Sequence, residues 1–182
     1  MRLRIISGYL KNRNIIVPKK IENFRPTMEK VRGAVADYLN DSITDAVVAD
    51  FCAGSGAFGM EMISRGAKYA HFIESNRLLC RNLKKNIQLF NIEHKCSVIN
   101  KDIRSYLKTM RKKVSIMYFD PPYNDVELSK IIPELMPFME KDGFVIVERV
   151  KKTKGLFSLP ENTYFVESRN YGKTSIDFYK NE

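Results

Sequence analysis

The sequence predicts a doubly wound α/β fold, in which helices cover both faces of a mostly parallel sheet. Five short and almost wholly apolar runs lie between residues 46 and 148, and amphipathic stretches of helical period separate them. This alternation is typical of βαβ units with a buried sheet. Two more strand-like runs flank Gly172-Lys173 near the end of the chain, and they predict an antiparallel hairpin at one sheet edge.

The first 40 residues precede this alternation and predict a small extension. Residues 3–6 (LRII) and 14–17 (NIIV) have the composition of two short strands, with Gly8 and the segment KNRN as bend material between them. Apolar residues at i, i+4, i+7 and i+8 then predict an amphipathic helix over 28–39. We therefore expect an N-terminal hairpin and helix in residues 1–40 and the main domain in residues 41–182.

The main domain follows in order. The expected strands are 46–51 (AVVADF), 69–74 (YAHFIE), 96–100 (CSVIN), 114–119 (VSIMYF) and 143–148 (GFVIVE). The expected helices are 57–65, 76–90, 103–110 and one within 126–139. The last two strands are YFVESRNY and TSIDFY, which form the predicted C-terminal hairpin.

Composition excludes several classes of protein. A length of 182 residues suits one domain, and a hydrophobic content of 44% is enough for a core. No run approaches the length that spans a bilayer, and the N-terminus lacks a signal-peptide pattern. We expect a soluble, cytoplasmic monomer that does not bind a membrane.

The cysteine and histidine pattern does not favour a metal site or a disulfide framework. The three cysteines, Cys52, Cys80 and Cys96, form no CxxC pair, and the chain has only two histidines. Small buried hydrophobic side chains are the favoured interpretation of the cysteines. We expect no metal.

Positive charge is concentrated at the N-terminus. The formal net charge is +10, and residues 1–35 alone carry nine basic and two acidic side chains. Such asymmetry favours a polyanion, in particular a nucleic acid, over a merely solvated basic surface. The candidate RNA-binding residues are Arg2, Arg4, Lys11, Arg13, Lys19 and Lys20.

Acidic residues lie at or just beyond four successive strand ends. They are Asp50, Glu74, Asp102 and Asp120. In open α/β sheets ligands bind outside the carboxyl ends of the strands, so the four carboxylates together predict a site there. Any one of them alone could equally cap a helix.

The segment GSGAFG fits the pattern G-x-G-x-x-G at Gly54, Gly56 and Gly59, between a predicted strand and a predicted helix. The glycines allow a tight turn and a close approach of the backbone to a ligand. Glu74, 18 residues beyond Gly56, can accept hydrogen bonds from ribose hydroxyls. The loop alone leaves NAD and S-adenosylmethionine both open as cofactors.

The segment DPPY, residues 120–123, favours S-adenosylmethionine. The Asp120 carboxylate and the Pro121 carbonyl are two acceptors that can hold an amine on a planar ring. Pro122 stiffens the loop because proline fixes φ, and Tyr123 can stack on a base. A nicotinamide dehydrogenase has no use for this arrangement.

The sequence resembles the class I S-adenosylmethionine methyltransferases that modify exocyclic amines, and within them the RsmD-type bacterial 16S rRNA (guanine-N2)-methyltransferases. The resemblance covers nearly the whole chain. It is carried by RIISG (4–8), RPT (25–27), DFCAGSGAFGMEMISRGA (50–67), FIE (72–74), DPPY (120–123) and YGKT (171–174).

The resemblance implies a Rossmann-like seven-stranded sheet and transfer of a methyl group from S-adenosylmethionine to the N2 amine of a guanine in 16S rRNA. It implies that DPPY is catalytic, that Glu74 holds the ribose and that Asp102 meets the adenine amine. The implied cofactor-binding residues are Arg25, Pro26, Thr27, Asp50, Ala53, Gly54, Ser55, Gly56, Glu74 and Asp102. It points to the small ribosomal subunit as the partner.

Two alternatives stay open from the residues alone. DPPY serves amino methyltransferases that act on adenine N6, or on DNA or tRNA, equally well. A non-catalytic RNA-binding or ribosome-assembly factor could also retain this fold, although an intact glycine loop, four strand-end acids and DPPY argue against a dead site.

Overall fold

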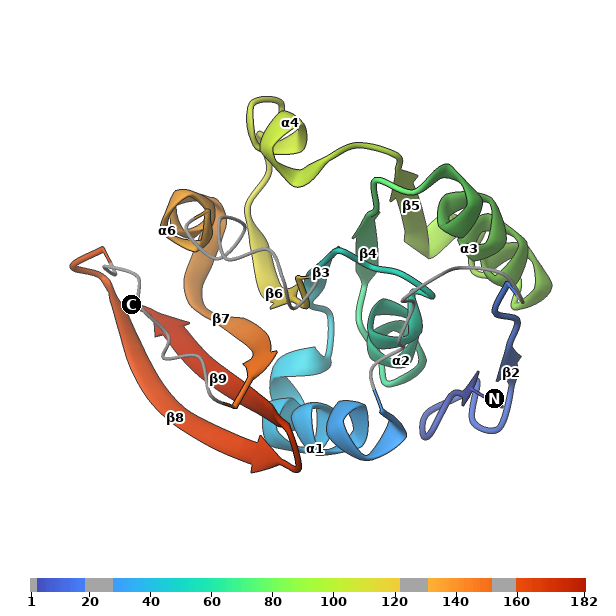
Figure 1. The fold of residues 1–182 in the computed structure, drawn as a ribbon, viewed down its shortest axis with the longest axis horizontal. Coiled ribbons are helices and arrows are strands. Elements are labelled where there is room, and N and C mark those ends of the chain that lie inside the picture. The colour runs from blue at the N-terminus through green and yellow to red at the C-terminus, as the bar shows by residue number, and fades with distance from the viewer. Residues whose placement is uncertain (1–2, 19–27, 122–130, 152–159) are drawn as a thin grey trace.

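The computed structural model describes residues 3–18, 28–121, 131–151 and 160–182. Their centre is a seven-stranded sheet with the strand order β5-β4-β3-β6-β7-β9-β8 (Figure 1). The strands are β3 (Val47–Phe51), β4 (Tyr69–Ile73), β5 (Cys96–Ile99), β6 (Val114–Phe119), β7 (Met139–Val150), β8 (Thr163–Tyr171) and β9 (Thr174–Asn181).

Strands β5, β4, β3, β6 and β7 pair in parallel, whereas β9 pairs antiparallel with both β7 and β8. The predicted mostly parallel sheet with a C-terminal antiparallel hairpin is therefore confirmed. The connection from β3 to β4 runs outward and that from β5 to β6 returns past both strands, so β3 and β6 are neighbours at the centre of the sheet.

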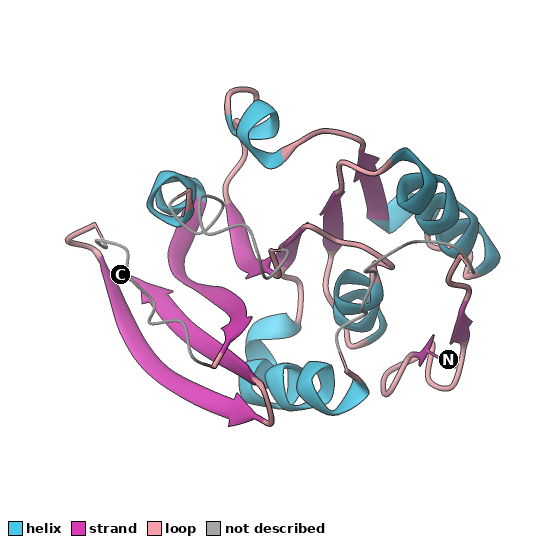
Figure 2. Ribbon diagram, in the orientation of Figure 1, coloured by secondary structure: helices cyan, strands magenta, loops and turns pink. Residues whose placement is uncertain are grey.

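Helices lie on both faces of the sheet (Figure 2). They are α1 (Glu29–Leu39), α2 (Ala57–Ser64), α3 (Arg77–Leu89), α4 (Ile103–Leu107) and α6 (Ile132–Leu135), with short 3-10 segments at Asn40–Ile43, Glu93–Lys95 and Met136–Phe138. The helix expected within 126–139 is seen here only from residue 132 onward, because residues 122–130 lie outside the described part of the chain.

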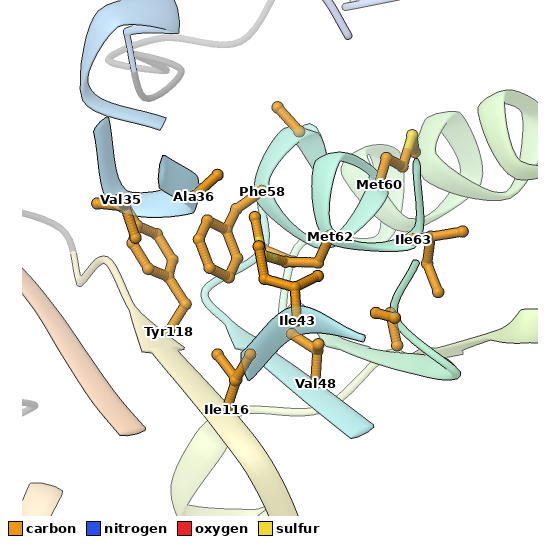
Figure 3. Close-up of a cluster of buried hydrophobic side chains, with 14 of the residues drawn as sticks. Val35, Ala36, Ile43, Val48, Phe58, Met60, Met62, Ile63, Ile116 and Tyr118 are labelled. Atoms are coloured by element: carbon orange, nitrogen blue, oxygen red, sulfur yellow. The ribbon is translucent and has the colours of Figure 1, made fainter. Parts of the chain in front are cut away.

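Two apolar clusters fill the space between the sheet and its helices. On one face α1 and α2 meet β6, and Phe58 stacks on Tyr118 with ring centroids 3.9 Å apart (Figure 3). On the other face Phe51, Met117 and Leu135 belong to the second cluster. Because neighbouring strand residues point to opposite faces, the almost continuous apolar runs supply both clusters at once.

Strand β7 starts four residues earlier than the sequence predicts. Its first residues, MEKD, are mostly charged, so they lack the apolar signal from which the strand was predicted. The pairing of β6 with β7 also shifts register between Val114 and Ile116. Gly143 lies at this irregularity, where an added Cβ would come within 2.8 Å of the Ser115 carbonyl oxygen.

The N-terminal hairpin consists of β1 (Leu3–Arg4) and β2 (Asn14–Ile15), each shorter than predicted. It packs against α2 and α3. The backbone N–H groups of Ile6 and Ser7 donate to the Glu61 carboxylate at 2.8 and 3.0 Å. On the other side Ile16 exchanges two hydrogen bonds with the side chain of Asn86.

Within the described residues, no helix is long and apolar enough to cross a membrane, and the three cysteines are free thiols. No group of three or more His, Cys, Asp or Glu side chains gathers there in a way that could hold a metal ion.

Candidate active site at the carboxyl edge of the sheet

The four predicted acids come together at the edge where the parallel strands end. Asp50 belongs to β3, while Glu74, Asp102 and Asp120 follow β4, β5 and β6. These four strands are adjacent in the sheet, in the order β5-β4-β3-β6. The thiol of Cys52 lies among them. Burial raises the pKa of this thiol, and the charges of the carboxylates raise it further, in the order Glu74, Asp120, Asp50 and Asp102.

The glycine loop joins β3 to α2 in a fixed conformation. The Ala53 N–H donates to the Ile73 carbonyl at 3.1 Å, which ties the loop to β4. Gly54 and Gly56 have φ angles of 55° and 74°, which side chains disfavour. A Cβ on Gly56 would also lie 2.0 Å from Leu83 Cδ1, so a side chain there would both strain the backbone and displace Leu83. Ala53 and Ser55 are buried within it.

Asp50 is buried beneath the loop and contacts the start of α2. Its side chain is 2% exposed, and Oδ2 accepts a hydrogen bond from the Gly59 N–H at 3.0 Å. Gly59 lies in the first turn of α2, where backbone N–H groups have no partner within the helix. Burial raises the pKa of Asp50 to about 8, against the opposing effect of the Gly59 hydrogen bond. The carboxylate therefore holds the start of α2.

Glu74 joins the loop to the end of β4. Its Oε2 accepts from the Gly54 N–H and its Oε1 from the Asn76 N–H, each at 2.8 Å. The predicted ribose-binding carboxylate thus lies directly beside the glycine loop, whose residues are predicted to bind the cofactor. A carboxylate offers about four acceptor positions, so these two bonds leave others for a ligand.

Two asparagines that the sequence analysis missed support Glu74. Asn100 donates to the carbonyl oxygens of Glu74 and Ser75 at 3.0 and 2.8 Å. Asn76 caps α3 by accepting from the N–H groups of Leu78 and Leu79. The cap could have been found, because an asparagine directly before a periodic helical run is a start signal. Asn100 follows its strand without any such signal.

Asp102 occupies the most open part of the edge. It caps α4 by accepting from the Arg104 N–H at 2.9 Å, and its side chain is 47% exposed. An exposed carboxylate here could accept from an amine of a bound ligand.

Asp120 follows β6, beside the glycine loop. Its side chain is half-buried, and its N–H approaches the Phe51 carbonyl of β3 at 3.5 Å. Pro121 is buried. Pro122 and Tyr123 lie outside the described residues, as do the predicted cofactor-covering residues Arg25, Pro26 and Thr27.

Of the six predicted RNA-binding residues, three lie outside the described part of the chain and three lie within it. Arg2, Lys19 and Lys20 lie outside the described residues. Lys11 is exposed, and Arg4 lies 3.5 Å from Glu29 in an exposed ion pair. The Arg13 guanidinium donates to the Leu89 carbonyl at 2.7 Å, so it bridges the hairpin to the end of α3.

Comparison with known proteins decides the family. The family model described as "Conserved hypothetical protein 95" matches residues 3–180. A curated relative from Buchnera aphidicola, named Ribosomal RNA small subunit methyltransferase D, is 35% identical over 83% of this chain and 80% of its own length. This chain belongs to that family.

Members of the RsmD family from other bacteria also match. The Escherichia coli protein of the same name is 28% identical over 100% of this chain and 91% of its own length. The solved structure of yhhF from Escherichia coli superposes with a TM-score of 0.88 at 28% identity, covering 100% of this chain and 99% of that one. HI0767 from Haemophilus influenzae gives a TM-score of 0.83 at 26% identity with the same coverage.

Proposed function

We propose that this RsmD-family protein transfers a methyl group from S-adenosylmethionine to the exocyclic N2 amine of a guanine in 16S rRNA of the small ribosomal subunit. The convergence of four strand-end carboxylates beside the glycine loop, with Asp120-Pro121 on the strand next to that loop, carries the proposal. The names of the curated relatives support the rRNA substrate.

The residues at the sheet edge fit S-adenosylmethionine. The half-exposed Gly54 has no side chain to exclude the methionine portion, and the adjacent Glu74 carboxylate can accept from ribose hydroxyls. Asp102 is exposed one strand further along and can accept from the adenine amine. Arg25, Pro26 and Thr27 would cover the cofactor. When bound, S-adenosylmethionine supplies a methyl group on a sulfonium, which is a good leaving group.

Asp120 and Pro121 act on the acceptor. The N2 lone pair of guanine is delocalised into the ring and is a poor nucleophile. The Asp120 carboxylate accepts one N2–H and the Pro121 carbonyl accepts the other, which turns the lone pair toward the methyl donor. Orientation and proximity supply most of the rate gain. The Asp120 charge also stabilises the positive charge that develops on the nitrogen. The methylated nitrogen then releases one N–H proton, which Asp120 takes or passes to water. Tyr123 stacks on the base.

Nucleoside mass spectrometry of 16S rRNA tests this proposal. We expect one N2-methylguanosine to be lost in cells that lack the protein and restored by the wild-type chain. The Asp120→Ala variant should not restore it, because the amine loses its charged acceptor, with a rate loss on the order of 100-fold or more. A thermal-shift measurement with S-adenosylmethionine should show that this variant still binds the cofactor.

Three outcomes would contradict the proposal. Unchanged N2-methylguanosine in the deleted strain would remove the proposed product. Loss of N6-methyladenosine instead would favour the adenine-directed alternative. Activity of Asp120→Ala within a few-fold of the wild type would remove the proposed role of the carboxylate.

A further inference from the structure

Helix α3 presents an exposed face that carries only positive charge. Its exposed side chains are Arg77, Leu78, Arg81, Lys84, Lys85, Gln88 and Leu89, and the whole helix contains no acidic residue. Among the described residues, none forms an ion pair with any of the four cations. On α1, by contrast, Glu29 and Asp37 pair with Arg4 and Arg65.

This charge pattern opposes the stability of α3. Arg77 and Arg81, and likewise Arg81 and Lys85, are like charges four residues apart, and each such pair costs about 0.2–0.5 kcal/mol. Arg77 is also a cation in the first helical turn, where the helix dipole favours an anion. The helix is held instead by its opposite face, where Leu83 and Ile87 are buried. The exposed cations therefore need a reason other than folding.

The position of α3 supplies a reason for its exposed cations. The helix starts directly after Glu74 and Asn76 at the active-site edge, and its 13 residues extend about 20 Å away from it. Its far end meets the basic N-terminal hairpin, beside which it lies in Figure 1. There the Arg13 guanidinium donates to the Leu89 carbonyl and lies 5.3 Å from the Phe90 ring centroid.

An exposed aromatic ring lies at the same junction. Tyr9 of the hairpin is 59% exposed, and Lys95, which follows α3, lies 5.4 Å from the centroid of its ring. An aromatic ring among cations is a platform on which an unpaired base can stack while the cations contact phosphates. The hairpin thus meets the far end of α3 beside this ring, and α3 extends from there back to the active-site edge.

We propose that the exposed face of α3, with Arg77, Arg81, Lys84 and Lys85, is a second rRNA-binding surface that holds the sugar–phosphate backbone beside the target guanine. The inference rests on the proposed function for its substrate class. Contacts of Lys and Arg with phosphates position a nucleic acid without reading its sequence. The α3 surface therefore sets affinity and register, while the site at Asp120 selects the base.

The test compares two pairs of adjacent lysines. Lys84→Gln/Lys85→Gln removes two cations from the α3 surface. Lys112→Gln/Lys113→Gln removes two exposed cations from the segment before β6, and it is the matched control for net charge. The substrate is the small ribosomal subunit purified from cells that lack this protein. The measurements are kcat and KM for methyl transfer, subunit affinity as a function of salt, and binding of S-adenosylmethionine.

We expect Lys84→Gln/Lys85→Gln to weaken subunit binding and raise KM on the order of tenfold, with kcat and cofactor affinity unchanged. Each phosphate contact contributes about 0.7–0.9 to the slope of log affinity against log salt, so the slope should fall by about 1.5. The control pair should behave as the wild type, and Lys84→Arg/Lys85→Arg should restore binding.

Equal loss in the two Gln variants would reduce the effect to net charge and overturn the proposal, as would unchanged affinity of Lys84→Gln/Lys85→Gln. Failure of the proposed function has a different signature. In that case the wild-type chain itself would not methylate the subunits, while the two binding measurements would still separate the α3 surface from its control.

Discussion

Asp50 and Glu74 hold the glycine loop from two neighbouring strands. Asp50 accepts from Gly59 beneath the loop, and Glu74 accepts from Gly54 at its side. Both are buried, at 2% and 7% exposure, and burial raises the pKa of Asp50 to about 8. Asp50 thus anchors α2 through Gly59, and Glu74 is the carboxylate that contacts the loop at Gly54.

The buried Asp50 carboxyl should make stability fall as pH rises. Its pKa is about 8 in the folded protein against an ordinary 3.8, so the folded state binds the proton more tightly than the unfolded state. Stability is then fully present below pH 4 and is lost as pH rises toward 8. Between pH 5 and 8 we expect a loss of about 2–4 kcal/mol from this group.

Urea denaturation of Asp50→Asn at pH 5 and pH 8 measures this effect. The amide oxygen keeps an acceptor for the Gly59 N–H but carries no charge, so the variant should lose much less stability across this interval than the wild type. Asp41→Asn, at an exposed position, serves as the control and should leave the pH dependence unchanged. An equal pH dependence in Asp50→Asn and the wild type would show that Asp50 is not the group responsible.

At the scale of the element, α2 is fixed by close approach to its neighbours. A Cβ on Gly59 would lie 2.4 Å from Phe72 Cε1 on β4 and 3.2 Å from the Asp50 carboxylate. The helix can therefore approach the sheet this closely only without a side chain at that position. This contact sets how closely α2 approaches strand β4.

Two Gly→Ala substitutions in helices should differ in their effect on the free energy of unfolding. Gly59→Ala overpacks the contact with Phe72 and should destabilise the protein by about 1–3 kcal/mol. In Gly33→Ala, on α1, the new methyl group would meet only Ile6 Cδ1 at 3.6 Å, an ordinary contact. It should be neutral or stabilise by up to about 1 kcal/mol, since alanine favours the helix. Similar values from urea denaturation would contradict the steric explanation.

At the scale of the whole molecule, Glu61 connects the hairpin to the methyltransferase sheet. The carboxylate is fully buried on α2 and accepts from Ile6 and Ser7, while Arg65 donates to it at 3.0 Å. The guanidinium of Arg32, also fully buried, lies 3.5 Å from it and donates to the Arg4 carbonyl. One carboxylate thus holds the basic hairpin on α2, the helix that starts at the glycine loop.

Glu61→Gln should loosen the hairpin and destabilise the protein. Removing the charge leaves the buried Arg32 without its counter-ion, and breaking a buried pair in this way costs about 3–5 kcal/mol. Amide hydrogen exchange at Ile6 and Ser7 should accelerate more than in the central strands. Asp37→Asn removes only the exposed partner of Arg65 and should cost less than about 1 kcal/mol. Unchanged exchange at Ile6 and Ser7 in Glu61→Gln would contradict this role.

The sequence by itself determined the order of the elements and the sheet edge where the four acids lie. Strands that are buried on both faces must be apolar almost throughout. Their apolar runs, and the acids that end these runs, can therefore be recognised in the sequence. The two-residue turn Gly172-Lys173 likewise fixed the final hairpin. The sequence did not predict the charged start of β7 or the hydrogen bond from Asn100 to the Glu74 carbonyl, because neither follows a local pattern.

The tertiary structure alone decided which polar groups meet across long sequence separations. Glu61 contacts Ile6, 55 residues away, and Arg13 contacts Leu89, 76 residues away. A buried polar atom must find a partner wherever the fold brings one, and its neighbours along the chain do not reveal which. For that reason the anchoring of the hairpin and its contact with the end of α3 emerge only when the chain is folded.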